Sequence, residues 1–469
     1  MHVTMSAPDR HAVRPTRLKA AALLTALLAP AVLLAAENAP STLPLLPLSS
    51  HTTAKLPTSD LLAPAKTAAK PVAAEESYRE KDVWGRIRSG YAIPDLDNSL
   101  VGKHASWYSA RPDHMARTSA RASRYLFHVV TELEKRGMPT ELALLPFIES
   151  AFNPQALSSA NAAGMWQFVP GTGRDFNLKQ NVFKDERRGV LASTDAALTY
   201  LQRLYDMFGD WQLALAAYNW GEGSVQKAIL RNQAAGKPTN FEALAELMPA
   251  ETRNYVPKLQ AVKNIVANPG HYGLSLPQID NQPYFTAIDK TSDIDLAIAA
   301  QLAELPIDEF KALNPQFNRP VITGGEQTQI LLPKENAEKF HLNMAQWGRA
   351  LSTWTTHKIT SARERIETLA SKFGTTPEVI RQANNIPQRS VLKAGSTILV
   401  PKLSTSANID IGQEVADNAI VSYEADRGGK RSSGYKQAGN GNSAKKAPVS
   451  LVKSRVSRDA AGKKKTQRN

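Results

Sequence analysis

In the stretch ELALLPFIESAFNP, residues 141–154, an apolar run that begins at Leu142 ends on one carboxylate, Glu149, and the predicted helix is apolar on nearly every side. Leu142, Leu145 and Pro146 share a face with Glu149 at helical spacing. A carboxyl group among apolar side chains loses hydration, which raises its pKa toward neutrality. Glu149 is therefore a candidate general acid, although a single Glu at a helix end is more often a structural residue that reaches solvent.

Apolar residues recur at helical spacing on both sides of this stretch, from about residue 77 to residue 272. Thr140, Ser193 and Asp210 are the predicted N-caps of three helices, and the last helix is predicted over residues 251–267. This region is therefore predicted to be nearly all α.

A repeat follows the helical region. Residues 284–300 align without a gap with residues 354–370, at a spacing of 70, and the alignment continues to Asn314 and Asn384. Each copy then closes on a short apolar strand and a proline, in QILLP and TILVP. One copy reads strand, two short helices, strand, so the sequence predicts two small α+β (βααβ) modules.

The N-terminal part has the pattern of an export signal. Basic residues precede a run without charged residues over residues 20–36, and residues 37–76 are rich in Pro, Ala, Ser and Thr. We predict a signal peptide over residues 1–36 and a disordered linker over 37–76. An anchor that is not cleaved is the alternative, since seventeen residues are at the short limit for a membrane-spanning helix.

The chain contains no cysteine, which excludes disulfides, thiol nucleophiles and a lipid-modified cysteine. No pair of histidines has metal-ligand spacing, so the sequence predicts no metal and no cofactor.

Most of the net charge of +14 lies at the C-terminal end. Residues 427–469 contain thirteen Lys or Arg and one acid, Asp459, a net charge of +12. We predict a basic disordered tail over residues 403–469. Its charge predicts electrostatic contact with anionic wall polymers or a membrane, and no nucleic acid is expected as a partner of an exported protein.

Four short motifs follow one another through the helical region: ES at 149–150, GMWQF at 164–168, AYNWG at 217–221 and NYV at 254–256. Their aromatic faces, hydroxyls and amides suit a sugar ligand. In order and spacing they resemble the catalytic domain of the soluble lytic transglycosylases, glycoside hydrolase family 23. Within that family the pattern is similar to the membrane-bound D branch of the lytic murein transglycosylases.

The resemblance implies a mainly α, lysozyme-like catalytic domain that cleaves the bond between N-acetylmuramic acid (MurNAc) and N-acetylglucosamine (GlcNAc) in peptidoglycan. Glu149 would act as the single acid and base and leave a 1,6-anhydromuramic acid end. A single acid suits this reaction, since most glycosidases need a second carboxylate. The family's substrate-holding and orienting positions match Ser150, Ser158, Gln167, Tyr218, Asn219 and Tyr255.

The chain departs from the family in three respects. Trp220 stands where a small residue is usual, and the signal lacks a lipid-modified cysteine, so a lipoprotein is not expected. Both repeats resemble LysM modules, which bind peptidoglycan, but lack their usual Gly-Asp-Thr. The first copy is degenerate enough that a spacer is an equal alternative to a binder.

The resemblance and the patterns give one expected organisation. The expected parts after the linker are a catalytic domain at 77–275, a degenerate LysM-like module at 282–333, a LysM module at 353–402 and the tail. The expected location is the periplasm, with membrane association as an alternative. A hydrolytic muramidase and an inactive wall-binding scaffold are the other functions considered.

Overall fold

The computed structural model describes residues 81–290, 292–323, 328–403 and 409–426. The predicted signal peptide, the linker and the tail after residue 426 lie outside the described residues. None of the described helices is long and apolar enough to cross a membrane.

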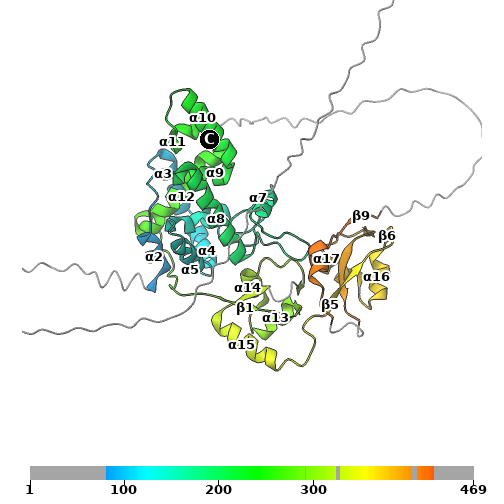
Figure 1. The fold of residues 1–469 in the computed structure, drawn as a ribbon. Coiled ribbons are helices and arrows are strands. Elements are labelled where there is room, and N and C mark those ends of the chain that lie inside the picture. Colours follow the sequence, from blue (N-terminus) through cyan, green and yellow to red (C-terminus); the bar gives the residue numbers. More distant parts are fainter. Residues whose placement is uncertain (1–80, 291, 324–327, 404–408, 427–469) are drawn as a thin grey trace, which may run out of the picture. The chain divides into compact units, whose positions relative to one another are not determined.

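The first part is helical, as predicted (Figure 1). Short 3-10 turns (η) connect some of its helices. The elements are α2 (Val83–Ser89), α3 (Ser99–Ser109), α4 (Pro112–Ala122), α5 (Leu126–Lys135), η1 (Thr140–Leu144), α6 (Leu145–Glu149), α7 (Pro170–Asp175), α8 (Val190–Phe208), α9 (Trp211–Trp220), α10 (Glu222–Ala234), α11 (Phe241–Leu244), η2 (Ala245–Leu247), α12 (Ala250–Ala267) and η3 (Pro269–Tyr272).

Residues 141–149 do not form one continuous α-helix. They lie in the 3-10 turn η1 and then in the short helix α6. Pro146 stands at the start of α6, where a missing N–H costs nothing, whereas inside a longer helix its ring would clash with the preceding turn. The break at Pro146 therefore sets where the helix that ends at Glu149 begins.

Two of the three predicted N-caps are wrong. Thr140 is buried, and its hydroxyl donates to the carbonyl of Ile87 at 2.6 Å instead of capping the turn. Ser193 lies inside α8, which begins at Val190, because burial of Val190 extends the helix toward the N-terminus. Asp210 is confirmed as a cap, since its carboxylate accepts from the Leu213 N–H at 2.9 Å.

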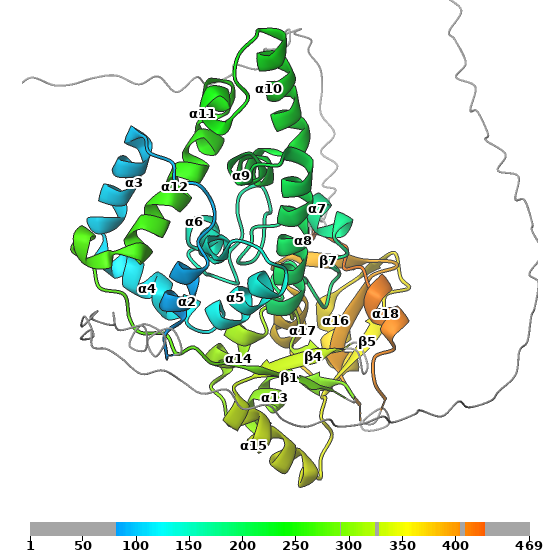
Figure 2. The same ribbon diagram turned by 60° about the vertical axis from the view of Figure 1, so that its left-hand side comes forward.

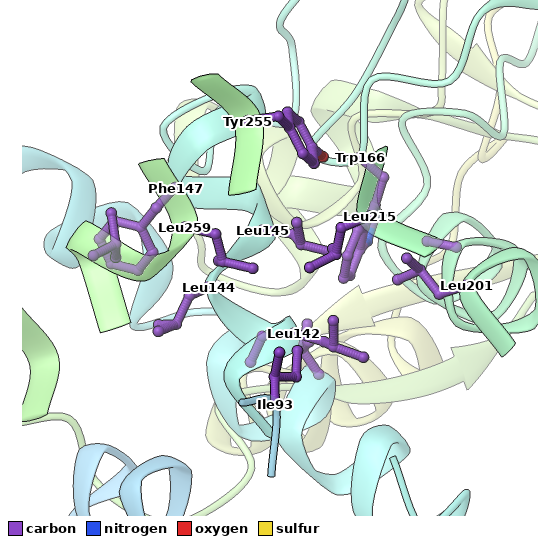
Figure 3. Packing of buried hydrophobic residues seen from close by; sticks show 14 of the residues in the cluster. Ile93, Leu142, Leu144, Leu145, Phe147, Trp166, Leu201, Leu215, Tyr255 and Leu259 are labelled. Atoms are coloured by element: carbon purple, nitrogen blue, oxygen red, sulfur yellow. The ribbon is translucent and has the colours of Figure 1, made fainter. Parts of the chain in front are cut away.

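One core joins the helices of this part. The long helix α12 packs against α3 and α9, and Figure 2 shows α3 beside α12. The η1–α6 stretch passes through the middle of this core. Figure 3 shows its side chains among those of the neighbouring helices: Leu142, Leu144, Leu145, Phe147, Leu201, Leu215 and Leu259. Glu149 is thus carried by a segment that is fixed by packing on most sides.

The repeat predicted from the sequence is present as two βααβ modules. The first contains β1 (Thr286–Asp289), β2 (Ile294–Asp295), α13 (Leu296–Leu302), α14 (Ile307–Leu313), β3 (Val321–Ile322) and β4 (Gln329–Leu332), followed by α15 (Lys334–Ala345). The second contains β5 (Trp354–Lys358), β6 (Arg363–Glu364), α16 (Ile366–Lys372), α17 (Pro377–Asn384), β7 (Ser390–Lys393) and β8 (Thr397–Pro401).

The two modules share strand pairing and core. In each, the first strand pairs antiparallel with the last, β1 with β4 and β5 with β8, while the two inner strands pair with each other. In the first module α15 adds Ala337 and Phe340 to the core, so this core includes a helix beyond residue 333.

A buried asparagine occupies the same place in both modules. The Asn384 side chain donates to the carbonyls of Ile380 and Leu399 at 2.8 and 2.7 Å and accepts from the Leu399 N–H at 2.7 Å. Asn314 makes the same three bonds, to Phe310 and Leu331. One amide therefore ties the second helix to the last strand in each copy, which explains why both copies align on this residue.

We expect Asn384→Ala to lower the free energy of unfolding of the second module by about 2 to 3 kcal/mol. The substitution leaves the buried N–H and carbonyl of Leu399 without their partners. The exposed Gln382 on the same helix supplies the matched control, Gln382→Ala, with an expected change within about 0.5 kcal/mol. Hydrogen exchange of peptides from residues 354–401 measures both. Equal effects of the two substitutions would contradict the assigned role.

The prediction of disorder from residue 403 is wrong for residues 409–426. They form α18 (Gln413–Asn418) and β9 (Tyr423–Ala425), and β9 pairs antiparallel with β7. Ile411, Ala416 and Ala419 are buried, and these apolar side chains explain why this segment packs although the sequence after it is basic.

Candidate active site

Glu149 lines a cavity of about 570 Å³ in the helical part. The walls come from α6, the loop before α7, the end of α9 and the first turns of α12. The cavity is lined by Ile148, Glu149, Ser158, Ala160, Ala162, Gln167, Phe168, Val169, Thr172, Tyr200, Tyr218, Asn219, Trp220, Gly221, Glu251, Tyr255 and Lys258. A cavity of about 630 Å³ beside Trp211 is lined by a different acid, Asp210, which is already the cap of α9. The Glu149 cavity is therefore the better candidate.

Two glutamates, Glu141 and Glu149, flank the apolar run 142–148 and have opposite surroundings. Glu141 is buried and its charge is balanced: it lies 3.2 Å from the Lys263 ammonium and accepts from the N–H groups of Ala92 and Ile93. Glu149 has no ion-pair partner in the described part of the chain and accepts a hydrogen bond from the Tyr255 hydroxyl. Glu141 is thus a structural acid, and Glu149 is free to take part in chemistry.

Burial raises the pKa of Glu149 to about 7. The Tyr255 hydrogen bond opposes this rise, since it stabilises the carboxylate, while the nearby Glu251 carboxylate adds to it. The pKa of Tyr255 is raised well above its usual value by burial and by Glu149, so the phenol stays protonated and remains a donor. A carboxyl group with this pKa can hold a proton at neutral pH and release it to a substrate.

The backbone reverses directly after Glu149. Ala151 and Phe152 both have left-handed φ values, 51° and 54°, which residues other than Gly rarely adopt. The Ser150 hydroxyl donates to the Met165 carbonyl at 3.0 Å and connects this reversal to the GMWQF loop. The direction in which Glu149 points is therefore fixed by the strained turn and by the hydrogen bond from Ser150 to the loop.

The GMWQF loop is held in an unusual conformation that brings Gln167 into the cavity. Gly164 has φ 84°, and a Cβ there would come within 2.0 Å of the Arg187 carbonyl, so only Gly fits. Arg187 donates to the Phe168 carbonyl at 3.1 Å. Gln167 itself has φ 52°, and its amide donates to the Gly164 carbonyl at 2.8 Å.

The end of α9 supplies two more polar groups. The Tyr218 hydroxyl donates to the Trp166 carbonyl at 2.9 Å, and Asn219 accepts from the Thr252 hydroxyl at 2.7 Å. The helix ends at Gly221, where φ is 89°. These contacts fix Tyr218 and Asn219 against the loop and against α12.

The cavity brings together six of the seven residues singled out in the sequence. Besides Glu149, the lining residues among them are Ser158, Gln167, Tyr218, Asn219 and Tyr255. Ser150 does not line the cavity, because its hydroxyl bonds to the loop backbone. The described residues contain no group of His, Cys, Asp or Glu side chains placed to hold a metal ion.

Comparisons with known proteins match three parts of the chain to known families. Residues 130–241 match the Transglycosylase SLT domain, residues 284–347 the LysM-like domain of lytic transglycosylase MltD, and residues 364–401 the LysM domain. The chain is 33% identical over 370 residues to membrane-bound lytic murein transglycosylase D of Escherichia coli, covering 76% of this chain and 80% of that protein. The chain belongs to the lytic murein transglycosylase family.

Shorter matches concern other members and relatives. A putative tributyltin chloride resistance protein of an Alteromonas strain is 37% identical over 191 residues, 40% of this chain and 89% of that protein. The 70 kDa soluble lytic transglycosylase of Escherichia coli, a solved structure, is 29% identical, with a TM-score of 0.24 over 29% of this chain and 24% of that one.

The lytic transglycosylase motifs did not reveal Glu251 and Lys258, which also line the cavity. Both lie on α12 outside the residues matched to the catalytic domain. The spacing of the sequence could have revealed both residues, since positions 251, 255 and 258 share one helix face by the i, i+4, i+7 rule. Glu149 is thus not the only carboxylate in the cavity, which corrects the expectation of an isolated acid.

Proposed function

We propose that this protein cleaves the glycan strands of peptidoglycan between MurNAc and GlcNAc without water, with Glu149 as acid and then base. The observation that carries the proposal is the Glu149 carboxyl, which has no salt-bridge partner among the described residues, has a pKa of about 7 and lines a cavity together with aromatic and amide groups. This combination suits proton donation to a sugar oxygen.

The proposed reaction has two steps. Glu149 first gives its proton to the glycosidic oxygen, so the bond from MurNAc C1 breaks and GlcNAc leaves with a free 4-hydroxyl. The Glu149 carboxylate then takes the proton of the MurNAc C6 hydroxyl, whose oxygen bonds to C1 and closes the 1,6-anhydro ring. The carboxyl group is regenerated, and no water is consumed. The substrate N-acetyl group is the proposed internal stabiliser of C1.

The other residues of the site hold Glu149 or the sugars. Tyr255 orients the carboxyl group by its hydrogen bond, and Ser150 holds the strained turn behind it. Ser158, Gln167 and Asn219 have polar groups on the cavity wall for the sugar hydroxyls and acetamido groups. Tyr218 is also assigned to sugar binding, and Trp220 adds an aromatic ring to the lining of the same cavity.

A hydrolytic muramidase is the second candidate, and Glu251 is the observation that favours it. A second carboxylate on the cavity wall could activate a water molecule, as in paired-acid glycosidases. Glu251→Gln separates the two: a transglycosylase keeps forming anhydro ends, whereas a hydrolase loses its base. The chemical form of the new glycan ends, anhydro or reducing, decides between them.

The LysM-type modules support binding to peptidoglycan, and we propose that they keep the enzyme on its substrate. The proposed parts are the catalytic domain at 77–275 and the modules at 282–333 and 353–402, with the first module extended by α15. The relationship to a membrane-bound murein transglycosylase supports a place in the cell envelope, and the predicted signal peptide suggests the periplasm.

We expect deletion of residues 427–469 to weaken binding to sacculi or anionic vesicles at low salt, because this segment carries a net charge of +12. The effect should fall below about twofold at 0.5 M salt, where charges are screened beyond a few ångströms. Cosedimentation at both salt concentrations measures it, with cleavage of dissolved strands as the control for folding. Equal binding of both proteins at low salt would refute this role of the tail.

A further inference from the structure

A neighbouring cavity of about 470 Å³ shares two lining residues with the Glu149 cavity, Ile148 and Lys258. Several of its walls come from residues 103–114, on α3 and the start of α4. This segment precedes the residues matched to the Transglycosylase SLT domain, 130–241. The cavity therefore lies next to the proposed site but is built in part from a different segment of the chain.

Aromatic and apolar side chains form much of the wall, among them Trp107, Tyr108 and Phe147. The Trp107 side chain is 43% exposed although it is large and apolar. It is nevertheless held in place, since the Arg111 guanidinium lies 4.3 Å from its ring centre and the His114 ring packs edge-on at 5.4 Å. A fixed, exposed indole is a typical feature of a binding surface.

The charge of this cavity is positive. Lys103 and Lys258 line it, no Asp or Glu does, and neither lysine has an ion-pair partner within the described ranges. The His104 Nε2–H donates to the Asn254 amide oxygen at 2.7 Å, because an amide oxygen can only accept. Burial lowers the pKa of His104 and His114, which leaves the two lysines as the source of charge at neutral pH.

We propose that this cavity binds the acidic peptide that peptidoglycan carries on its muramic sugar. The inference rests on the proposed function, which puts a muramic sugar beside Glu149. Such a peptide combines carboxylates with methyl groups, and the cavity combines two lysines without acidic partners with aromatic walls. While the peptide is attached, the lactyl carboxyl of MurNAc is an amide, so the glycan itself offers no anion for Lys103 or Lys258. Because Ile148 and Lys258 line both cavities, the second cavity is next to the first and within reach of a peptide attached to a sugar there.

Binding to the full-length protein carrying Glu149→Gln tests the proposal without cleavage. The probes are a MurNAc–GlcNAc tetrasaccharide with its peptides and the same tetrasaccharide after an amidase has removed them and the freed lactyl carboxyls have been converted to methylamides. We expect the peptide-bearing form to bind about fivefold more tightly or better, and Lys103→Met to reduce this preference to less than about twofold. The matched control is Lys227→Met, at an exposed lysine on α10, which should keep the preference.

Equal affinity for the two probes would overturn the inference. A Lys103→Met protein that binds both probes more weakly by the same factor would also overturn it, because the cavity would then hold sugars. Trp107→Ala provides an independent variant with the same expected loss of preference. If the active protein forms no anhydro products while the binding preference is present, the proposed function fails and the peptide site stands. If anhydro products form without any preference, only the peptide site fails.

Discussion

Glu149→Gln is expected to lower the rate of glycan cleavage by about 10³-fold or more. The amide has nearly the same size, so the packing around α6 is kept, but it can neither give a proton to the glycosidic oxygen nor take one from the C6 hydroxyl. General acid–base catalysis contributes about 10²- to 10⁴-fold, and in the proposed mechanism one group supplies both transfers. Release of soluble fragments from purified sacculi measures the rate.

Glu242→Gln is the matched control, because Glu242 is exposed on α11 and does not line the cavity. It should leave cleavage within about twofold of the unchanged protein. Sacculus binding should survive in both variants. Cleavage at the normal rate by Glu149→Gln would remove this residue from the mechanism, and absence of cleavage by the unchanged protein would favour an inactive wall-binding scaffold.

Tyr255→Phe is expected to lower kcat/KM by about ten- to hundredfold and to change the pH profile in a defined direction. In the proposed mechanism the protonated form of Glu149 starts the reaction, so the rate of the unchanged protein should be full below pH 7 and fall as pH rises through about 7. The Tyr255 hydroxyl lowers the pKa of Glu149. Removal of the hydroxyl therefore raises the pKa of Glu149. The alkaline limb of the pH–rate profile moves to higher pH, although the rate itself drops.

The pH profile separates this role from simple loss of structure. Damaged packing would lower the rate at every pH without moving the limb upward. Tyr272→Phe is the matched control on the neighbouring turn η3, outside the cavity, and should leave both the rate and the limb unchanged. A limb for Tyr255→Phe that stays in place or moves to lower pH would contradict the assigned hydrogen bond.

Periodicity predicted the helical part and the two modules, and motif order singled out six residues that the fold brings together in one cavity. They could not show which of two glutamates in one apolar stretch is structural. Glu141 and Glu149 are both set among apolar residues, and only the fold brings Lys263 to Glu141 and Tyr255 to Glu149. Both partners come from α12, more than a hundred residues further along the chain. Local sequence patterns carry no information about such contacts.

Other differences have equally local causes. Pro146 divides a stretch whose hydrophobic pattern alone suggests one helix. Residues 409–426 are ordered because three small or medium apolar side chains, Ile411, Ala416 and Ala419, find a surface to pack against. Glu251 was missed because motif matching does not consider helix faces, although its spacing from Tyr255 placed it on the cavity side.

The chemical form of the new glycan ends tests the central claim most directly. Purified full-length protein is incubated with sacculi, and the products are analysed by mass spectrometry without a reduction step. Ring closure by the C6 hydroxyl predicts 1,6-anhydromuramic ends, lighter by one water than hydrolysed ends, with no incorporation of label from H₂¹⁸O. Reducing muramic ends that carry ¹⁸O would contradict the account and identify the protein as a hydrolase.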